Sequence, residues 1–145
     1  MLQPTPSGGW VREGRVSPIF VWLWKRRFNP SYGDLGRWGE WIALRHLQDM
    51  GWDVVARNWR GRRGEVDLIA WHDSWLVFAE VKTSVLPSPF LPEERVDPEK
   101  QRRMQRLAYE FIWRYELEEA PVRLDVIAVE TRDQIRFRLR HYVLQ

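Results

Sequence analysis

Two acidic residues and a lysine lie at a spacing that suits metal-dependent cleavage of a phosphodiester. Asp67 lies near the start of one short apolar segment, and Glu80 and Lys82 lie two positions apart on the next. Because side chains alternate along a strand, Glu80 and Lys82 are expected on one face, with Val81 pointing the other way. On its own the Glu80–Lys82 pair is more typical of a surface ion pair. The combination with Asp67 is what indicates a site.

The connection between the two segments predicts that the carboxylates are neighbours. A tight turn at residues 72–74 joins them, so an antiparallel pairing places Asp67 opposite residue 79 or 80. Neighbouring carboxylates repel each other unless a cation lies between them. We therefore expect Mg²⁺ or Mn²⁺ to be bound by Asp67, Glu80 and the backbone carbonyl of Val81.

Two further residues complete the expected chemistry. Lys82 would position the attacking water and stabilise charge in the transition state. Glu40, on a predicted helix, would reach the site from the side, although a glutamate at such a position is more often a solvated helix residue. The expected catalytic residues are thus Asp67, Glu80, Lys82 and Glu40.

The composition limits the kind of metal site that the chain can form. The chain has 145 residues, enough for one domain with a substantial core. It has no cysteine, which excludes disulfides and thiolate ligands. Its histidines, His46, His72 and His141, are scattered along the sequence. Oxygen ligands, and hence magnesium or manganese, are expected.

Basic residues gather in groups although the net charge is only +3. Arginine-rich patches favour contacts with phosphate, and an ordinary solvated surface is the alternative interpretation. The residues expected to bind nucleic acid are Arg57, Arg60, Arg62, Arg63, Lys100 and Arg103.

Hydrophobic periodicity predicts the order helix, three strands, helix, strand, strand. Three strands joined by short loops form an antiparallel meander, and the strand after the second helix joins the sheet in parallel through a right-handed crossover. The predicted fold class is α/β, with a mixed sheet flanked by helices. Asp97 and Pro98 predict the start of the second helix. The expected ranges are 34–50 and 98–115 for the helices and 52–59, 66–71, 75–82, 122–130 and 135–140 for the strands.

Residues 1–32 are predicted to form a partly disordered N-terminal extension, and residues 33–145 the domain that carries the site. Residues 3–9 are rich in Pro, Gly and Ser. The apolar run 19–24 is too short to span a membrane, and no convincing signal-peptide cleavage site is found. We expect a cytoplasmic protein without a transmembrane segment, with an arm that packs on the core. An interfacial membrane anchor is the alternative.

A set of motifs resembles a known family. The motifs are Gly36–Ala43, Arg57–Arg60, Gly64–Ala70, Phe78–Thr83, Lys100 with the helix that follows it, and Leu124–Val126. Together they resemble the YraN family, a largely uncharacterised bacterial family regarded as endonucleases, over about residues 33–145.

The resemblance implies a restriction-endonuclease-like αβββαβ core of the PD-(D/E)XK superfamily, related to archaeal-type Holliday junction resolvases. It implies that Asp67 is the first acid, that Glu80 and Lys82 form the E-x-K motif, and that Glu40 is the helix-borne glutamate. Ser84 departs from the family pattern, which usually has Arg after Val-Lys-Thr, so one phosphate-facing charge is expected to be absent.

These features lead us to expect a metal-dependent endonuclease that hydrolyses DNA phosphodiester bonds, including those of branched or otherwise structured DNA, without a small-molecule cofactor. Symmetric cutting of both strands would favour a homodimer. The alternative is a non-catalytic nucleic-acid-binding module on a nuclease scaffold. A third interpretation is a protein-interaction or membrane-peripheral factor that acts through residues 1–32.

Overall fold

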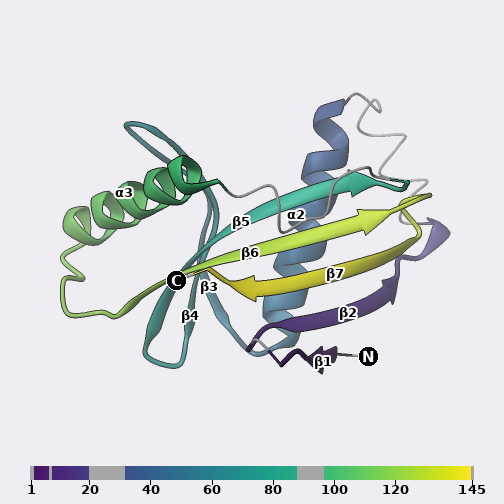
Figure 1. Ribbon diagram of the computed structural model, residues 1–145, viewed down its shortest axis with the longest axis horizontal. Helices are drawn as coiled ribbons and strands as arrows, with labels where there is room; N and C mark the ends of the chain where they lie inside the picture. Colours follow the sequence, from purple (N-terminus) through teal and green to yellow (C-terminus); the bar gives the residue numbers. More distant parts are fainter. Residues whose placement is uncertain (1, 7, 20–31, 88–96, 145) are drawn as a thin grey trace.

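A seven-stranded mixed sheet carries one helix on each face in the computed structural model (Figure 1). The structure describes residues 2–6, 8–19, 32–87 and 97–144. The strand order is β1-β2-β7-β6-β5-β4-β3; β5 and β6 are parallel, and the other neighbours are antiparallel. The predicted α/β class is confirmed. The elements are β1 Leu2–Pro4, β2 Trp10–Arg15, α2 Tyr32–Asp49, β3 Asp53–Gly61, β4 Gly64–His72, β5 Trp75–Val85, α3 Pro98–Arg114, β6 Val122–Thr131 and β7 Arg136–Val143.

The two helices bury their apolar faces on opposite sides of the sheet. Trp38 and Leu47 of α2 join a cluster that includes Val77 of β5. Phe111 of α3 joins a second cluster, which includes Phe78 of the same strand. Both faces of β5 are therefore covered, which explains its continuous apolar run.

The meander and the crossover form as the sequence predicts. β4 pairs with β5 in the register Leu68↔Ala79, and the two strands are joined by the tight turn after His72. The chain then returns through α3 so that β6 lies parallel to β5. α3 begins where the sequence indicates, because the Asp97 side chain accepts a hydrogen bond of 2.7 Å from the backbone N–H of Lys100.

The first residues of the chain extend the sheet, and residues 20–31 of the predicted N-terminal extension lie outside the described residues. β2 pairs with β7 along its whole length, and β1 pairs with β2. Val16, which follows β2, is buried in the α2-side cluster. Without β2, the edge of β7 would be unpaired, and this edge supplies the backbone hydrogen-bond partners of β2. Composition alone does not reveal such an edge. In the part of the chain that the structure describes, no helix is long and apolar enough to cross a membrane.

Candidate metal centre at the fork between β4 and β5

The site lies at the fork, the point beyond Leu68 and Ala79 at which β4 and β5 separate. Their ladder ends at the Leu68↔Ala79 pair, and β5 then continues beside β6 alone, while the β3–β4 hairpin turns toward α3 (Figure 1). Beyond this point the Val81 N–H donates to the Asp67 carboxylate, at 2.8 Å from Oδ2. A side chain thus replaces the missing strand, and this hydrogen bond fixes Asp67 against β5 in the fork.

Glu80 and Lys82 lie on one face of β5, as the strand period predicts. Lys82 Nζ lies 3.5 Å from Glu80 Oε1, and Lys100 Nζ, from the first turn of α3, lies 2.7 Å from the same oxygen. Glu80 Oε2 is buried and has no hydrogen-bond partner among the residues that the structure describes. Asp67, Glu80 and Glu65 line one small cavity, over which Arg103 of α3 also lies. The fork therefore gathers the two acids and the lysine that the sequence singles out.

Glu40 reaches the fork from the helix on the other side of the site. Gly39 lets α2 approach β5 closely, because a Cβ at this position would overlap the Thr83 side chain. Glu40 is within electrostatic reach of Asp67 and hydrogen-bonds Asn58. Asn58 has a positive φ of 49° in β3. Nothing in the sequence pattern indicates this Asn58 contact, since it depends on an irregular backbone.

The electrostatics of the fork disfavour bare ionised acids. Burial, followed by the charge of Asp67, raises the pKa of Glu40. Burial also raises the pKa of Asp67; the hydrogen bond from Val81 opposes this shift, and the charge of Glu80 adds to it. The pKa of Lys82 is lowered, first by burial and then by the neighbouring Lys100. A cation bound between the acids would relieve their repulsion, and Lys82 is a better proton acceptor than an exposed lysine.

The donor set suits a hard divalent ion that keeps much of its water. Asp67, the unpartnered Glu80 Oε2 and the expected ligand, the Val81 carbonyl, would supply oxygen ligands only. Mg²⁺ in proteins is commonly held by one or two carboxylates, with water completing the octahedron. Within the described ranges no group of three histidine or acidic side chains is close enough to hold a metal ion unaided. A water-rich Mg²⁺ or Mn²⁺ site is thus compatible with the residues present.

The predicted nucleic-acid-binding residues fall into two groups. Arg57 is exposed on β3, and Arg60 is engaged with Glu65 at 2.6 Å. The others lie along α3 and the β3–β4 turn that packs against it, where the Arg62 N–H donates to Glu110 at 3.1 Å. Arg62 and Arg63 line a hollow beside α3 together with Arg106, which is not among the residues expected to bind nucleic acid. Lys100 contacts Glu80 and Arg103 overlies the acid cavity.

The three histidines, scattered along the sequence, meet in one network in the structure. His46 Nε2 lies 3.0 Å from His141 Nδ1, and His72 Nδ1 lies 2.9 Å from Arg123, which links it to the same network. The network is centred on the buried Asp125. Residues distant in sequence meet because α2, β4, β6 and β7 converge there. None of the three lines the acid cavity.

Comparisons with known proteins identify relatives of the chain. Residues 39–129 match the model of the uncharacterised protein family UPF0102. A UPF0102 protein of Rhodococcus opacus (strain B4) is 45% identical over 95 residues, which cover 66% of this chain and 80% of that protein. A UPF0102 protein of Chlorobium phaeobacteroides (strain BS1) is 40% identical over 112 residues, which cover 77% and 89% of the two chains. The matched segment runs from the α2 residue beside Glu40 to β6 and so contains the whole fork.

Proposed function

Because the chain belongs to the uncharacterised protein family UPF0102, also called the YraN family, its activity must be argued from its own site, and we propose that it is a metal-dependent endonuclease acting on DNA. One observation carries the proposal. Asp67, Glu80 and Lys82 meet at the fork of β4 and β5, and Glu80 keeps one buried carboxylate oxygen without a partner among the described residues.

Each residue of the fork has a role in the proposed reaction. Asp67 and Glu80, with the Val81 carbonyl, would hold Mg²⁺ or Mn²⁺. When bound, the ion would supply charge stabilisation for the phosphodiester. Lys82, whose pKa is lowered by burial, would hold the attacking water and accept its proton more readily than a solvated lysine. Glu40 would orient the water or the ion from the α2 side.

DNA is proposed as the substrate because basic side chains surround the fork. Lys100 and Arg103 lie at its α3 edge, and Arg62, Arg63 and Arg106 continue the basic surface past the hairpin turn. Such a surface would hold the phosphate backbone without reading its sequence. Cleavage of linear, flapped and four-way DNA by the full chain tests the proposal. Cutting of at least one substrate is expected with Mg²⁺ or Mn²⁺ and none with EDTA; no cutting under any of these conditions would contradict it.

A non-catalytic nucleic-acid-binding module is the second candidate, and the position of Lys100 favours it. Its ammonium group lies 2.7 Å from Glu80 Oε1 and neutralises a proposed metal ligand. In a scaffold that no longer binds metal, the Lys100 ammonium would permanently replace the positive charge of the metal ion. Titration with Mn²⁺ separates the two candidates. A nuclease requires that the wild-type chain binds Mn²⁺ and that Glu80→Gln does not. A non-catalytic module requires salt-dependent DNA binding and no binding of Mn²⁺.

A further inference from the structure

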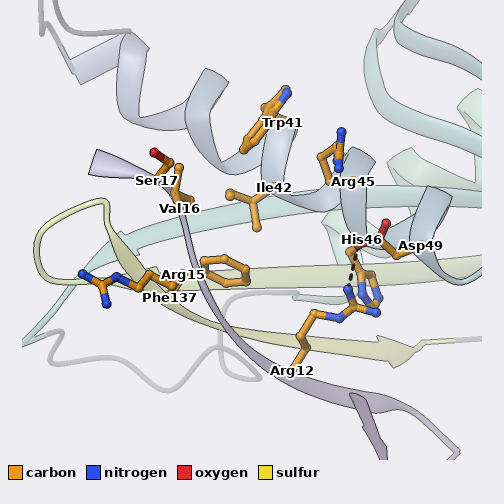
Figure 2. Close-up of a pocket in the computed structure, with 10 residues that line it drawn as sticks. All are labelled: Arg12, Arg15, Val16, Ser17, Trp41, Ile42, Arg45, His46, Asp49 and Phe137. Carbon is orange, nitrogen blue, oxygen red and sulfur yellow. Dashed lines mark hydrogen bonds and ion pairs between the residues drawn. The ribbon is translucent and has the colours of Figure 1, made fainter. Parts of the chain in front are cut away.

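A second pocket lies between β2 and α2 (Figure 2). Its volume is about 780 Å³ when the mouth open to solvent is counted. Three arginines line it, Arg12 and Arg15 from β2 and Arg45 from α2. None of Asp67, Glu80 and Lys82 contributes to it, so the pocket is separate from the fork.

A buried hydrogen-bonded chain ends at this pocket. Arg123 Nε and Nη2 donate to Asp125, at 2.8 and 2.9 Å, and Asp125 Oδ2 lies 2.6 Å from His141 Nε2. His141 Nδ1 lies 3.0 Å from His46 Nε2. His46, only 1% exposed, also lines the pocket (Figure 2). Its Nδ1 is buried and finds no hydrogen-bond partner in the described ranges.

The chain of partners determines what His46 Nδ1 offers. The carboxylate of Asp125 only accepts, so His141 Nε2–H donates to it. Arg123 also donates to Asp125, and His141 Nδ1 shares its hydrogen bond with His46 Nε2, so that both nitrogens of the His141 ring are engaged. Burial, with the nearby His141 and Arg12, lowers the pKa of His46 to about 3, so its ring is neutral. His46 Nδ1 is therefore the open end of this chain, and a group that can both donate and accept a hydrogen bond would satisfy it.

The remaining walls attract an anion with an apolar body. Arg12 pairs with Asp49 at 3.0 Å, which leaves two of the three arginine charges of the pocket without an acid among its lining residues. Arg12 Nε is also buried and unsatisfied within the part of the chain that the structure describes. Trp41 and Phe137 supply flat apolar surface beside these charges (Figure 2).

We propose that this pocket binds a phosphate monoester with an aromatic or other apolar body. A monoprotonated phosphate is one group with both properties that the pocket requires: it carries a P–OH and bare oxygens and so can donate or accept at His46 Nδ1, and its other oxygens accept from the arginines. The apolar body packs on Trp41 and Phe137. β2 and Phe137 lie outside residues 39–129, the segment that the family model matches. Half of the residues that line the pocket therefore lie outside this segment.

Phenyl phosphate and phenyl sulfate provide a matched test with the full chain. The two probes have the same shape, but only the phosphate carries a proton near pH 6, about the second pKa of a phosphate monoester. Calorimetry at this pH is expected to show phenyl phosphate binding about tenfold more tightly than phenyl sulfate. Inorganic phosphate is expected to bind more weakly than phenyl phosphate, because it lacks the apolar body. Equal affinities in either comparison would overturn the proposal.

Two further measurements locate the binding. Arg45→Gln should weaken phenyl phosphate binding by about tenfold, since it removes one charge-assisted contact, whereas Arg138→Gln on the exposed face of β7 should leave it unchanged. The ¹⁵N shift of His46 Nδ1 should move toward the hydrogen-bonded value when phenyl phosphate is added. An Nδ1 already hydrogen-bonded in the free protein and unmoved by the probe, or an Arg45→Gln variant with unchanged affinity, would overturn the assignment.

Discussion

The Asp67 carboxylate accepts the Val81 N–H at 2.8 Å, across the point where β4 leaves β5. This contact does two things at once. It satisfies a backbone donor that has lost its neighbouring strand, and it holds a proposed metal ligand next to Glu80. Structure and proposed chemistry depend on the same side chain, and substitutions can separate them.

Replacing Asp67 with Asn or with Ala should separate the hydrogen bond from the charge. Asn retains an acceptor for the Val81 N–H, whereas Ala leaves this half-buried donor unpaired, at a cost of about 1–3 kcal/mol. Urea denaturation at pH 7 should therefore find Asp67→Ala less stable than Asp67→Asn by about that amount. Equal free energies of unfolding would show that the Val81 contact contributes nothing to the fork.

The stability of the metal-free protein should depend on pH through Asp67. Its folded pKa is raised by burial and by Glu80, so the folded state binds the proton more tightly than the unfolded state. The contribution of Asp67 to stability is therefore fully present below its unfolded pKa and is lost as pH rises through the folded one. In EDTA, the free energy of unfolding of the wild-type chain should fall relative to that of Asp67→Asn as the pH rises through the folded pKa of Asp67. A difference that does not change with pH would contradict the raised pKa.

Lys100→Gln should strengthen metal binding in the absence of DNA. The Lys100 ammonium contacts Glu80 Oε1 at 2.7 Å and competes with any cation for this carboxylate. Calorimetric titration with Mn²⁺ should show an affinity several-fold higher than that of the wild-type chain. Arg102→Gln, an exposed position two residues along α3, is the control and should leave the affinity unchanged. A weaker or unchanged affinity in Lys100→Gln would mean that Lys100 does not compete for the site.

Gly39→Ala should disturb the approach of α2 to β5. A Cβ at Gly39 overlaps the Thr83 side chain, and overpacking of this kind typically costs about 1–3 kcal/mol. Gly36→Ala is the matched control on the same helix, because its Cβ would meet no described atom within 4 Å. It should stabilise the protein by up to about 1 kcal/mol through helix propensity. Thermal denaturation of both variants gives the comparison, and a neutral Gly39→Ala would contradict the close packing.

Local pattern and register were enough to predict most of the fork. The strand period places Glu80 and Lys82 on one face, and the short turn after His72 sets the register that brings Asp67 to them. The Asp97 cap is likewise a local signal. These features depend on a few neighbouring residues, and one sequence contains that information.

Contacts between distant segments could not be predicted in this way. The place of β2 beside β7 depends on an open sheet edge, and the meeting of His46 with His141 depends on how α2 crosses the strands. The Lys100–Glu80 contact depends on where α3 starts relative to the fork. Neither periodicity nor composition encodes such distances, so a basic residue expected to bind phosphate turned out to contact a proposed metal ligand.

The most direct test of the central claim is single-turnover DNA cleavage in Mg²⁺ by the wild-type chain and by Asp67→Asn, Glu80→Gln and Lys82→Gln. Circular dichroism and DNA-binding measurements would establish that each variant is folded and still binds. Cleavage by the wild type, with a loss of at least about a hundredfold in each variant, is the predicted result. Cleavage that persists in both Asp67→Asn and Glu80→Gln would contradict a metal centre at the fork.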